Sequence, residues 1–158
     1  MMAAQTRKDG AVTPSNRPEG SRQYATFVVG DLFFGINVTE VQEVLRYQEM
    51  TGVPLAPPVS EGLINLRGQI VTALDMRRRL ALEPRAADSW PMNMVVRSED
   101  GPVSLLVDEI GDVVEVRPEQ FEPPPDNLNQ AHRQLMEGVY KLDTRLLLVL
   151  DREKVLQV

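Results

Sequence analysis

The 158-residue sequence contains no cysteine and a single histidine, His132. The lack of cysteine excludes a disulfide framework, a thiolate metal site and a cysteine nucleophile. A serine nucleophile would need His132 as its base, but no Gly-x-Ser-x-Gly turn is present to display the serine. Because its neighbours are polar, we expect His132 on the surface of a short helix. We therefore predict no catalytic residue, no metal site and, since phosphate-binding glycine loops are also missing, no cofactor.

Long hydrophobic runs are also missing. No segment has the roughly 20 consecutive apolar residues that a membrane-spanning helix needs, so direct membrane insertion is not expected. Residues 1–22 contain no apolar run of signal-peptide length and are rich in polar residues, glycine and proline. We interpret them as a disordered tail and expect a cytoplasmic protein that reaches membranes only through its partners.

Charge is distributed unevenly along the chain. Residues 1–22 carry four basic and two acidic side chains, a net of +2, and the whole-chain charge of −6 therefore leaves −8 on residues 23–158. An acidic body repels phosphate backbones, which argues against nucleic-acid binding. The exception is the run Arg77-Arg78-Arg79. We interpret it as the solvated face of a short helix, with an acidic protein partner or RNA as alternatives.

Residues 23–158 alternate short apolar or β-branched runs with turn residues, and hydrophobic residues make up 42% of the chain. Four pairs of runs flank tight-turn signals, which predicts hairpins of residues 23–29 with 32–36, 61–66 with 69–74, 92–97 with 103–107, and 139–142 with 146–150. A further strand is expected at residues 113–116. The pattern predicts an all-β fold of antiparallel barrels or a sandwich, in two halves divided near residues 82–91.

A few short helices are expected between the strands. Thr39 and Gln42 have capping-box spacing, and valines and a leucine follow at helical spacing, which predicts a helix of about two turns. Asp75 and Asp151 are predicted to cap two further helical turns. Another short helix is expected at residues 129–135.

One stretch resembles a known family. Gly62-Leu-Ile-Asn-Leu-Arg-Gly68, followed by Leu74-Asp-Met-Arg77, resembles the Asn-Leu-Arg-Gly core of CheW-like domains and the Asp-Leu-Arg that follows it. Three further blocks resemble the family in the expected order: residues 34–36 with 41–44, residues 105–108 with 111–113, and residues 138–139 with 146–151 and 155–156. The resemblance covers residues 23–158. Thr72 and Met76 depart from the family's usual proline and leucine.

The resemblance implies a fold of two small five-stranded SH3-like barrels that share an apolar core, with a few short helices. It also implies a non-catalytic adaptor that couples the cytoplasmic tip of methyl-accepting chemoreceptors to a CheA-type histidine kinase. The receptor's helical hairpin would lie between the barrels, and barrel surfaces would pair with the kinase regulatory domain.

The expected partner-binding residues centre on Arg67, whose planar guanidinium suits carboxylates on another protein. An internal ion pair of Arg67 with Glu61 or Asp75 is the alternative. The remaining predicted partner-binding residues are Gly62, Asn65, Gly68, Val41, Glu43 and Val44, and weaker candidates are Asp108 and Arg77. Gly62 and Gly68 would allow tight turns or a close approach of the backbone, and the two valines have core packing as their alternative role.

Alternatives remain open for the role of Asp108 and for the function of the protein. Asp108 ends an apolar strand, so a strand-terminating cap explains it equally well. A small β-barrel that binds RNA or a small ligand is the alternative function. The acidic body disfavours that function, and the aromatic residues at 24, 27, 33 and 34 lie far from the arginine run.

Overall fold

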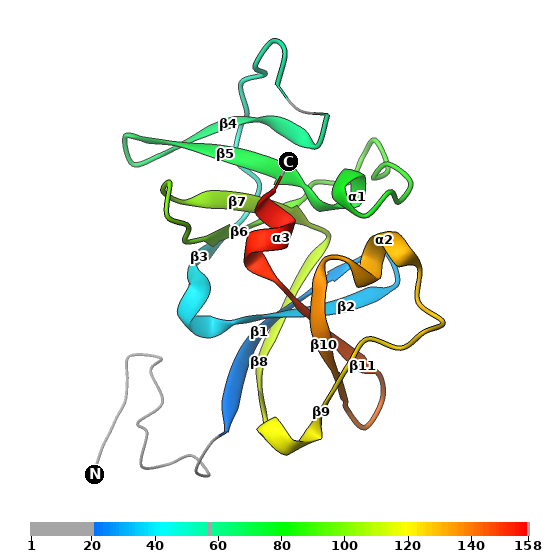
Figure 1. Cartoon of the computed structure of the whole chain (residues 1–158). Helices are drawn as coiled ribbons and strands as arrows, with labels where there is room; N and C mark the ends of the chain where they lie inside the picture. The colour runs from blue at the N-terminus through cyan, green and yellow to red at the C-terminus, as the bar shows by residue number, and fades with distance from the viewer. Residues whose placement is uncertain (1–20, 57, 158) are drawn as a thin grey trace, which may run out of the picture.

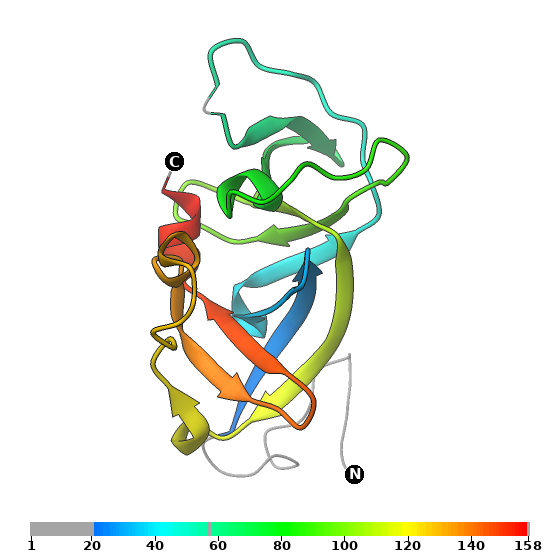
Figure 2. The ribbon, with the colours of Figure 1, turned by 90° about the vertical axis from the view of Figure 1, so that its right-hand side faces the viewer.

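The computed structural model describes residues 21–56 and 58–157, which form two β-sheets (Figure 1). The expected disordered tail lies outside the described residues except for its last two positions, Ser21 and Arg22. The first sheet has the strand order β8-β1-β2-β11-β10-β9 and the second β3-β6-β7-β5-β4. Figure 2 shows the second sheet stacked above the first, with the C-terminal helix between them at one side.

The first sheet contains six strands, which are β1 (Arg22–Val29), β2 (Leu32–Asn37), β8 (Glu109–Val116), β9 (Phe121–Glu122), β10 (Met136–Lys141) and β11 (Leu146–Leu150). The hairpins β1–β2 and β10–β11 confirm two of the four predicted hairpins. They join through parallel pairing of β11 with β2. The sixth strand, β9, has only two residues and pairs with β10.

The second sheet contains β3 (Val41–Leu45), β4 (Ser60–Leu66), β5 (Gln69–Asp75), β6 (Met92–Val96) and β7 (Val103–Val107). Its hairpins β4–β5 and β6–β7 confirm the other two predictions. Strand β5 pairs with β7 in parallel. The predicted division near residues 82–91 is wrong, because β5 and β6 on either side of that segment belong to the same sheet. The chain instead changes sheet between β2 and β3 and between β7 and β8.

Among the described residues, four short helical segments connect strands and a fifth follows the last strand. They are the 3₁₀-helices η2 (Val38–Glu40) and η3 (Pro118–Gln120) and the α-helices α1 (Met76–Arg79), α2 (Gln130–Arg133) and α3 (Arg152–Leu156). The carboxylate of Asp75 accepts a hydrogen bond from the backbone N–H of Arg77, and that of Asp151 from Lys154. Both predicted caps are therefore confirmed. Within the described residues, no helix is long and apolar enough to cross a bilayer.

The predicted helix after Thr39 is wrong. The helical residues are Val38–Glu40, and Asn37 rather than Thr39 caps them, with its side chain accepting from the Thr39 N–H. From Val41 onward the chain is strand β3, because it pairs with β6 along its length. A capping-box spacing was therefore present without the helix that usually follows it.

One apolar core is shared by the two sheets. The first sheet contributes Phe27 and Phe34, both fully buried with ring centroids 5.5 Å apart, and the second contributes Met94 and Leu105 to the same cluster. Burying such a side chain stabilises the fold by about 1.5–3 kcal/mol, so separating the sheets would expose several of them at once. The shared core and the predominantly β structure confirm the expected fold class.

His132 belongs to this packed interior and not to the surface, so that prediction is wrong. It is only 9% exposed. Its Nε2–H donates a hydrogen bond to the backbone carbonyl of Leu80, 2.9 Å away on the segment after α1. The polar neighbours of His132 in the sequence were misleading because, of the side chains of α2, only that of His132 is buried.

Candidate functional site

Arg67 occupies the first position of the two-residue turn between β4 and β5. Arg67 has a φ of 52° and Gly68 a φ of 90°. Positive φ at both central residues is typical of the type I′ turn, whose twist matches a two-residue hairpin. The side-chain oxygen of Asn65 accepts a 2.8 Å hydrogen bond from the Gly68 N–H and closes the turn. Local backbone geometry therefore holds the arginine in a conformation that a non-glycine residue seldom adopts.

The guanidinium of Arg67 pairs with the carboxylate of Glu43 on β3. Neither expected alternative partner is used, because Glu61 and Asp75 both pair with Arg78. The Arg67 side chain remains 70% exposed in spite of its ion pair, whereas that of Glu43 is 22% exposed. Most of the guanidinium therefore still faces solvent, where another protein can reach it.

This ion pair joins the two ends of the second sheet. Strands β3 and β4 are the first and last in its strand order. The segment after β3 also pairs with β4, because Thr51 and Leu63 exchange backbone hydrogen bonds of 2.8 and 2.9 Å. Such closure requires the sheet to curl, as in a small barrel. Arg67 and Glu43 therefore lie on the closed seam of a rigid scaffold.

The two candidate valines lie on β3 and not on a helix. Val41 is partly buried and packs against the shared core, while Val44 is 46% exposed. Core packing, the alternative considered for both, therefore applies to Val41, and Val44 is the exposed apolar residue. Ile70, 60% exposed on β5 and paired with Asn65, is a second exposed apolar residue of this region that the sequence did not single out. We call Val41, Glu43, Val44 and Arg67 the β3 surface.

The two candidate glycines are required by the conformation of the backbone. Gly62 has a φ of 155° beside a bulge in the β4–β5 pairing, and a Cβ atom there would lie 2.6 Å from the carbonyl oxygen of Thr51. Gly62 therefore permits the close approach that closes the sheet. Gly68 has open space around it and is needed only for its positive φ.

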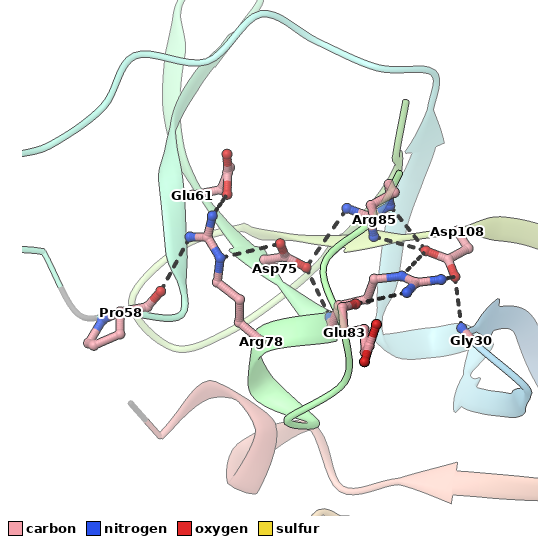
Figure 3. A network of polar contacts seen from close by, with 9 residues as sticks. Gly30, Pro58, Glu61, Asp75, Arg78, Glu83, Arg85 and Asp108 are labelled. Atoms are coloured by element: carbon pink, nitrogen blue, oxygen red, sulfur yellow. Dashed lines mark hydrogen bonds and ion pairs between the residues drawn. The ribbon is translucent and has the colours of Figure 1, made fainter. Parts of the chain in front are cut away.

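Asp108 and Arg77 form the centre of an ionic network where the two sheets meet (Figure 3). The Asp108 carboxylate accepts hydrogen bonds from Arg77 at 2.7 and 3.0 Å, from Arg85 at 3.1 Å and from the Gly30 N–H at 2.7 Å. Gly30 lies in the β1–β2 turn, Arg77 in α1, and Asp108 between β7 and β8. The network therefore ties the first sheet to the second, which is more than the strand-terminating cap considered for Asp108.

Burial and hydrogen bonding act on Asp108 in opposite directions. Burial alone would raise the pKa of the carboxyl, but hydrogen bonds from Arg77, Gly30 and Arg85 outweigh it, and the pKa lies below its usual range. Its side chain is only 16% exposed and that of Arg77 only 21%. These two weaker candidates are therefore better placed to hold the sheets together than to meet a partner.

The arginine run 77–79 is not a solvated face, so that interpretation is wrong. Arg77 is in the network above, and Arg78 pairs with Glu61 at 2.7 Å. Arg79 donates to the backbone carbonyls of Lys154, Val155 and Gln157 at the end of α3. With all three cations held by the protein itself, the run is poorly suited to binding RNA.

The geometry thus defines a two-barrel protein whose most distinctive exposed feature is a turn-mounted arginine beside an edge strand. The profile of the CheW-like domain matches residues 23–158. The chain therefore belongs to the CheW-like domain family, as the Asn-Leu-Arg-Gly motif indicated.

Individual relatives agree with this assignment. The chain is 31% identical to the chemotaxis protein CheW of Bacillus subtilis (strain 168), over 82% of this chain and 83% of the relative. It is 29% identical to the probable chemotaxis protein CheW of Rhizobium etli, over 85% and 87%. The crystal structure of the scaffolding protein TtCheW from Thermoanaerobacter tengcongensis has the same fold, with a TM-score of 0.78 and 24% identity over 87% of this chain and 93% of that one.

Proposed function

We propose that the protein is a non-catalytic cytoplasmic adaptor that couples methyl-accepting chemoreceptors to a CheA-type histidine kinase. Its relatives are named as chemotaxis and scaffolding proteins. Association with the membrane would then come through the receptor. The β3 surface would contact the receptor's helical tip or the kinase regulatory domain.

The observation that carries this proposal is the placement of Arg67. Its backbone is fixed by the type I′ turn, one nitrogen of its guanidinium is held by Glu43, and the side chain is still largely exposed. Arginine is enriched where proteins bind one another, because its planar fork of donors suits a partner's carboxylates. A preorganised arginine loses little freedom on binding, which favours affinity.

The neighbouring side chains complete a small interface of ordinary composition. Val44 supplies an exposed apolar contact on β3, on the face of the strand opposite to Glu43, because consecutive strand residues point to opposite faces. Interfaces commonly combine a desolvated apolar centre with a polar rim. Because β3 stands at the end of its sheet, a partner that covers this edge can contact both faces, so we expect it to cover Val44 and to place an acidic residue at Arg67.

Titration calorimetry with a purified CheA regulatory domain and, separately, a receptor-tip fragment tests the proposal. The variants are Arg67→Ala, Arg67→Glu, Val41→Glu and Val44→Glu, each checked for folding by circular dichroism. Charge reversal at a desolvated partner contact costs on the order of 2–5 kcal/mol of binding free energy. We expect Arg67→Glu and Val44→Glu to weaken binding of at least one partner by tenfold or more.

A matched control lies on the other sheet. Val113 on β8 is 56% exposed, close to the exposure of Val44. Val113→Glu adds the same charge to the same residue type away from the β3 surface, and should bind both partners like the unaltered protein. Wild-type affinity of every folded β3-surface variant for both partners would show that this surface is not the docking site.

A further inference from the structure

A second exposed feature lies on the second sheet, away from the Arg67 turn. A pocket of about 310 Å³ opens between the segment after β3 and the loop of residues 82–91. Apolar side chains form much of its lining, among them Met50, Leu82 and Leu106. The remaining wall comes from the ionic network, including Asp75 and Arg85. The pocket is therefore apolar inside with a charged wall.

Two aromatic residues line this pocket. Trp90 and Tyr47 pack with ring centroids 4.6 Å apart at an interplanar angle of 49°. Trp90 nevertheless remains 66% exposed. Tryptophan is a large side chain that proteins usually cover, and it is among the residues most enriched at binding hot spots. An exposed tryptophan that packs against a second aromatic ring beside a pocket indicates a binding site.

The free charge around the pocket is negative. The wall arginines are neutralised, since Arg78 pairs with Glu61 and Arg85 with Asp75 and Asp108. Glu49, Glu83 and Asp88 flank lining residues in the sequence without lining the pocket themselves. All three are exposed, and within the described part of the chain their carboxylates make no ion pair. Arg46 is a flanking cation, so the four flanking charges sum to −2. An electron-rich indole face within an acidic surround favours a cation.

We propose that this pocket receives an arginine side chain of a partner protein, with its guanidinium stacked on Trp90 and its charge balanced by Glu83 and Asp88. Arginine fits better than lysine because its planar, weakly hydrated head stacks on aromatic rings. The apolar lining favours an apolar residue next to that arginine. None of the residues that line the pocket belongs to the β3 surface.

Trp90 is the only tryptophan of the sequence, so its fluorescence reports on the pocket directly. The full chain is titrated with the capped peptide Gly-Leu-Arg-Leu-Gly and with the same peptide carrying glutamine in place of arginine. We expect a saturable change in Trp90 emission with the arginine peptide, and a dissociation constant at least fivefold weaker with the glutamine peptide. Equal responses to both peptides, or no saturable response at millimolar concentration, would overturn the proposal.

Two pairs of substitutions locate the effect. Glu83→Gln with Asp88→Asn should weaken the arginine peptide at least threefold, while Glu99→Gln with Glu119→Gln removes two exposed carboxylates elsewhere and should leave it unchanged. Equal weakening by both pairs would mean only general charge attraction and would contradict a specific site. Trp90→Leu, followed by nuclear magnetic resonance, should abolish the peptide-induced shifts of the 82–91 loop. Persistence of those shifts would equally reject the stacking contact.

Discussion

The guanidinium of Arg67 meets the carboxylate of Glu43 across the ends of one curled sheet, although 24 residues separate them in the sequence. The contact holds one nitrogen of the guanidinium and leaves most of the side chain exposed. An exposed ion pair of this kind stabilises a protein by only about 0–1 kcal/mol. Its position is therefore better explained by partner binding than by a contribution to stability. The two explanations predict different effects of a substitution on binding affinity and on the free energy of unfolding.

Arg67→Gly should separate stability from binding. Glycine adopts a φ of 52° without strain, which offsets the loss of an exposed ion pair, so we expect the free energy of unfolding to stay within about 1 kcal/mol of wild type. Binding of a partner that uses the guanidinium should fall tenfold or more. Urea denaturation and calorimetry on the same preparation measure both. A stability loss above about 3 kcal/mol would give the arginine a structural role instead.

Alanine substitutions at the two candidate glycines should differ in their cost. At Gly62 a methyl group would collide with the Thr51 carbonyl, whereas at Gly68 it meets no atom. Both positions have positive φ, so that strain is common to them. We expect Gly62→Ala to be the more destabilising by roughly 1–3 kcal/mol. Equal midpoints of thermal unfolding would show that the approach of Thr51 to Gly62 relaxes easily.

Asp108→Asn should destabilise the fold in a pH-dependent manner. It leaves Arg77 and Arg85 without their charged partner, at a cost on the order of 3 kcal/mol near neutral pH. Folding lowers the pKa of Asp108, so its charge stabilises the fold fully above the ordinary aspartate pKa of about 3.9. This stabilisation is lost as the pH falls through the pKa of the folded state.

The difference between wild type and Asp108→Asn should therefore be largest at neutral pH and shrink below about pH 4. Guanidinium denaturation at a series of pH values measures it. Burial raises the pKa of Glu40 and of Glu137, and because both groups titrate in both proteins they cancel in the comparison. A difference that is constant across this range would mean that the network does not depend on the Asp108 charge.

His132→Ala should lower stability by about 1–3 kcal/mol, because it leaves the buried carbonyl of Leu80 without its donor. Gln134→Ala on the exposed side of the same region is the matched control, expected within about 0.5 kcal/mol of wild type. Thermal unfolding followed by circular dichroism measures both. Equal effects would place His132 outside the packed structure, as its polar sequence neighbours suggested.

Local signals in the sequence predicted most of the fold. Each hairpin has its own turn residues, such as Gly30-Asp31 between β1 and β2, and each confirmed helix cap is an aspartate directly before its helix. The strand β3 was misjudged because Val41 and Val44 fit a helical spacing while Val41, Glu43 and Leu45 fit an alternating one. Pairing with β6, some 50 residues away, decided between them.

The site could be predicted only in part. The family motif pointed to Arg67, but its partner Glu43 comes from a strand at the other end of the sheet. The contact of Asp108 with Gly30 likewise joins segments 78 residues apart. Such pairs depend on how the sheet curls and how the two sheets pack. No spacing within the sequence reports on either.

Exchanging the two charges, with Arg67→Glu and Glu43→Arg in one chain, tests the central claim most directly. The exchange keeps an ion pair between β3 and the β4–β5 turn but removes the exposed guanidinium from position 67. If that guanidinium contacts a partner, the double variant should fold with near wild-type stability and still bind the kinase regulatory domain or the receptor tip at least tenfold more weakly. Full recovery of binding by the exchanged pair would show that Arg67 matters only for holding β3 in place.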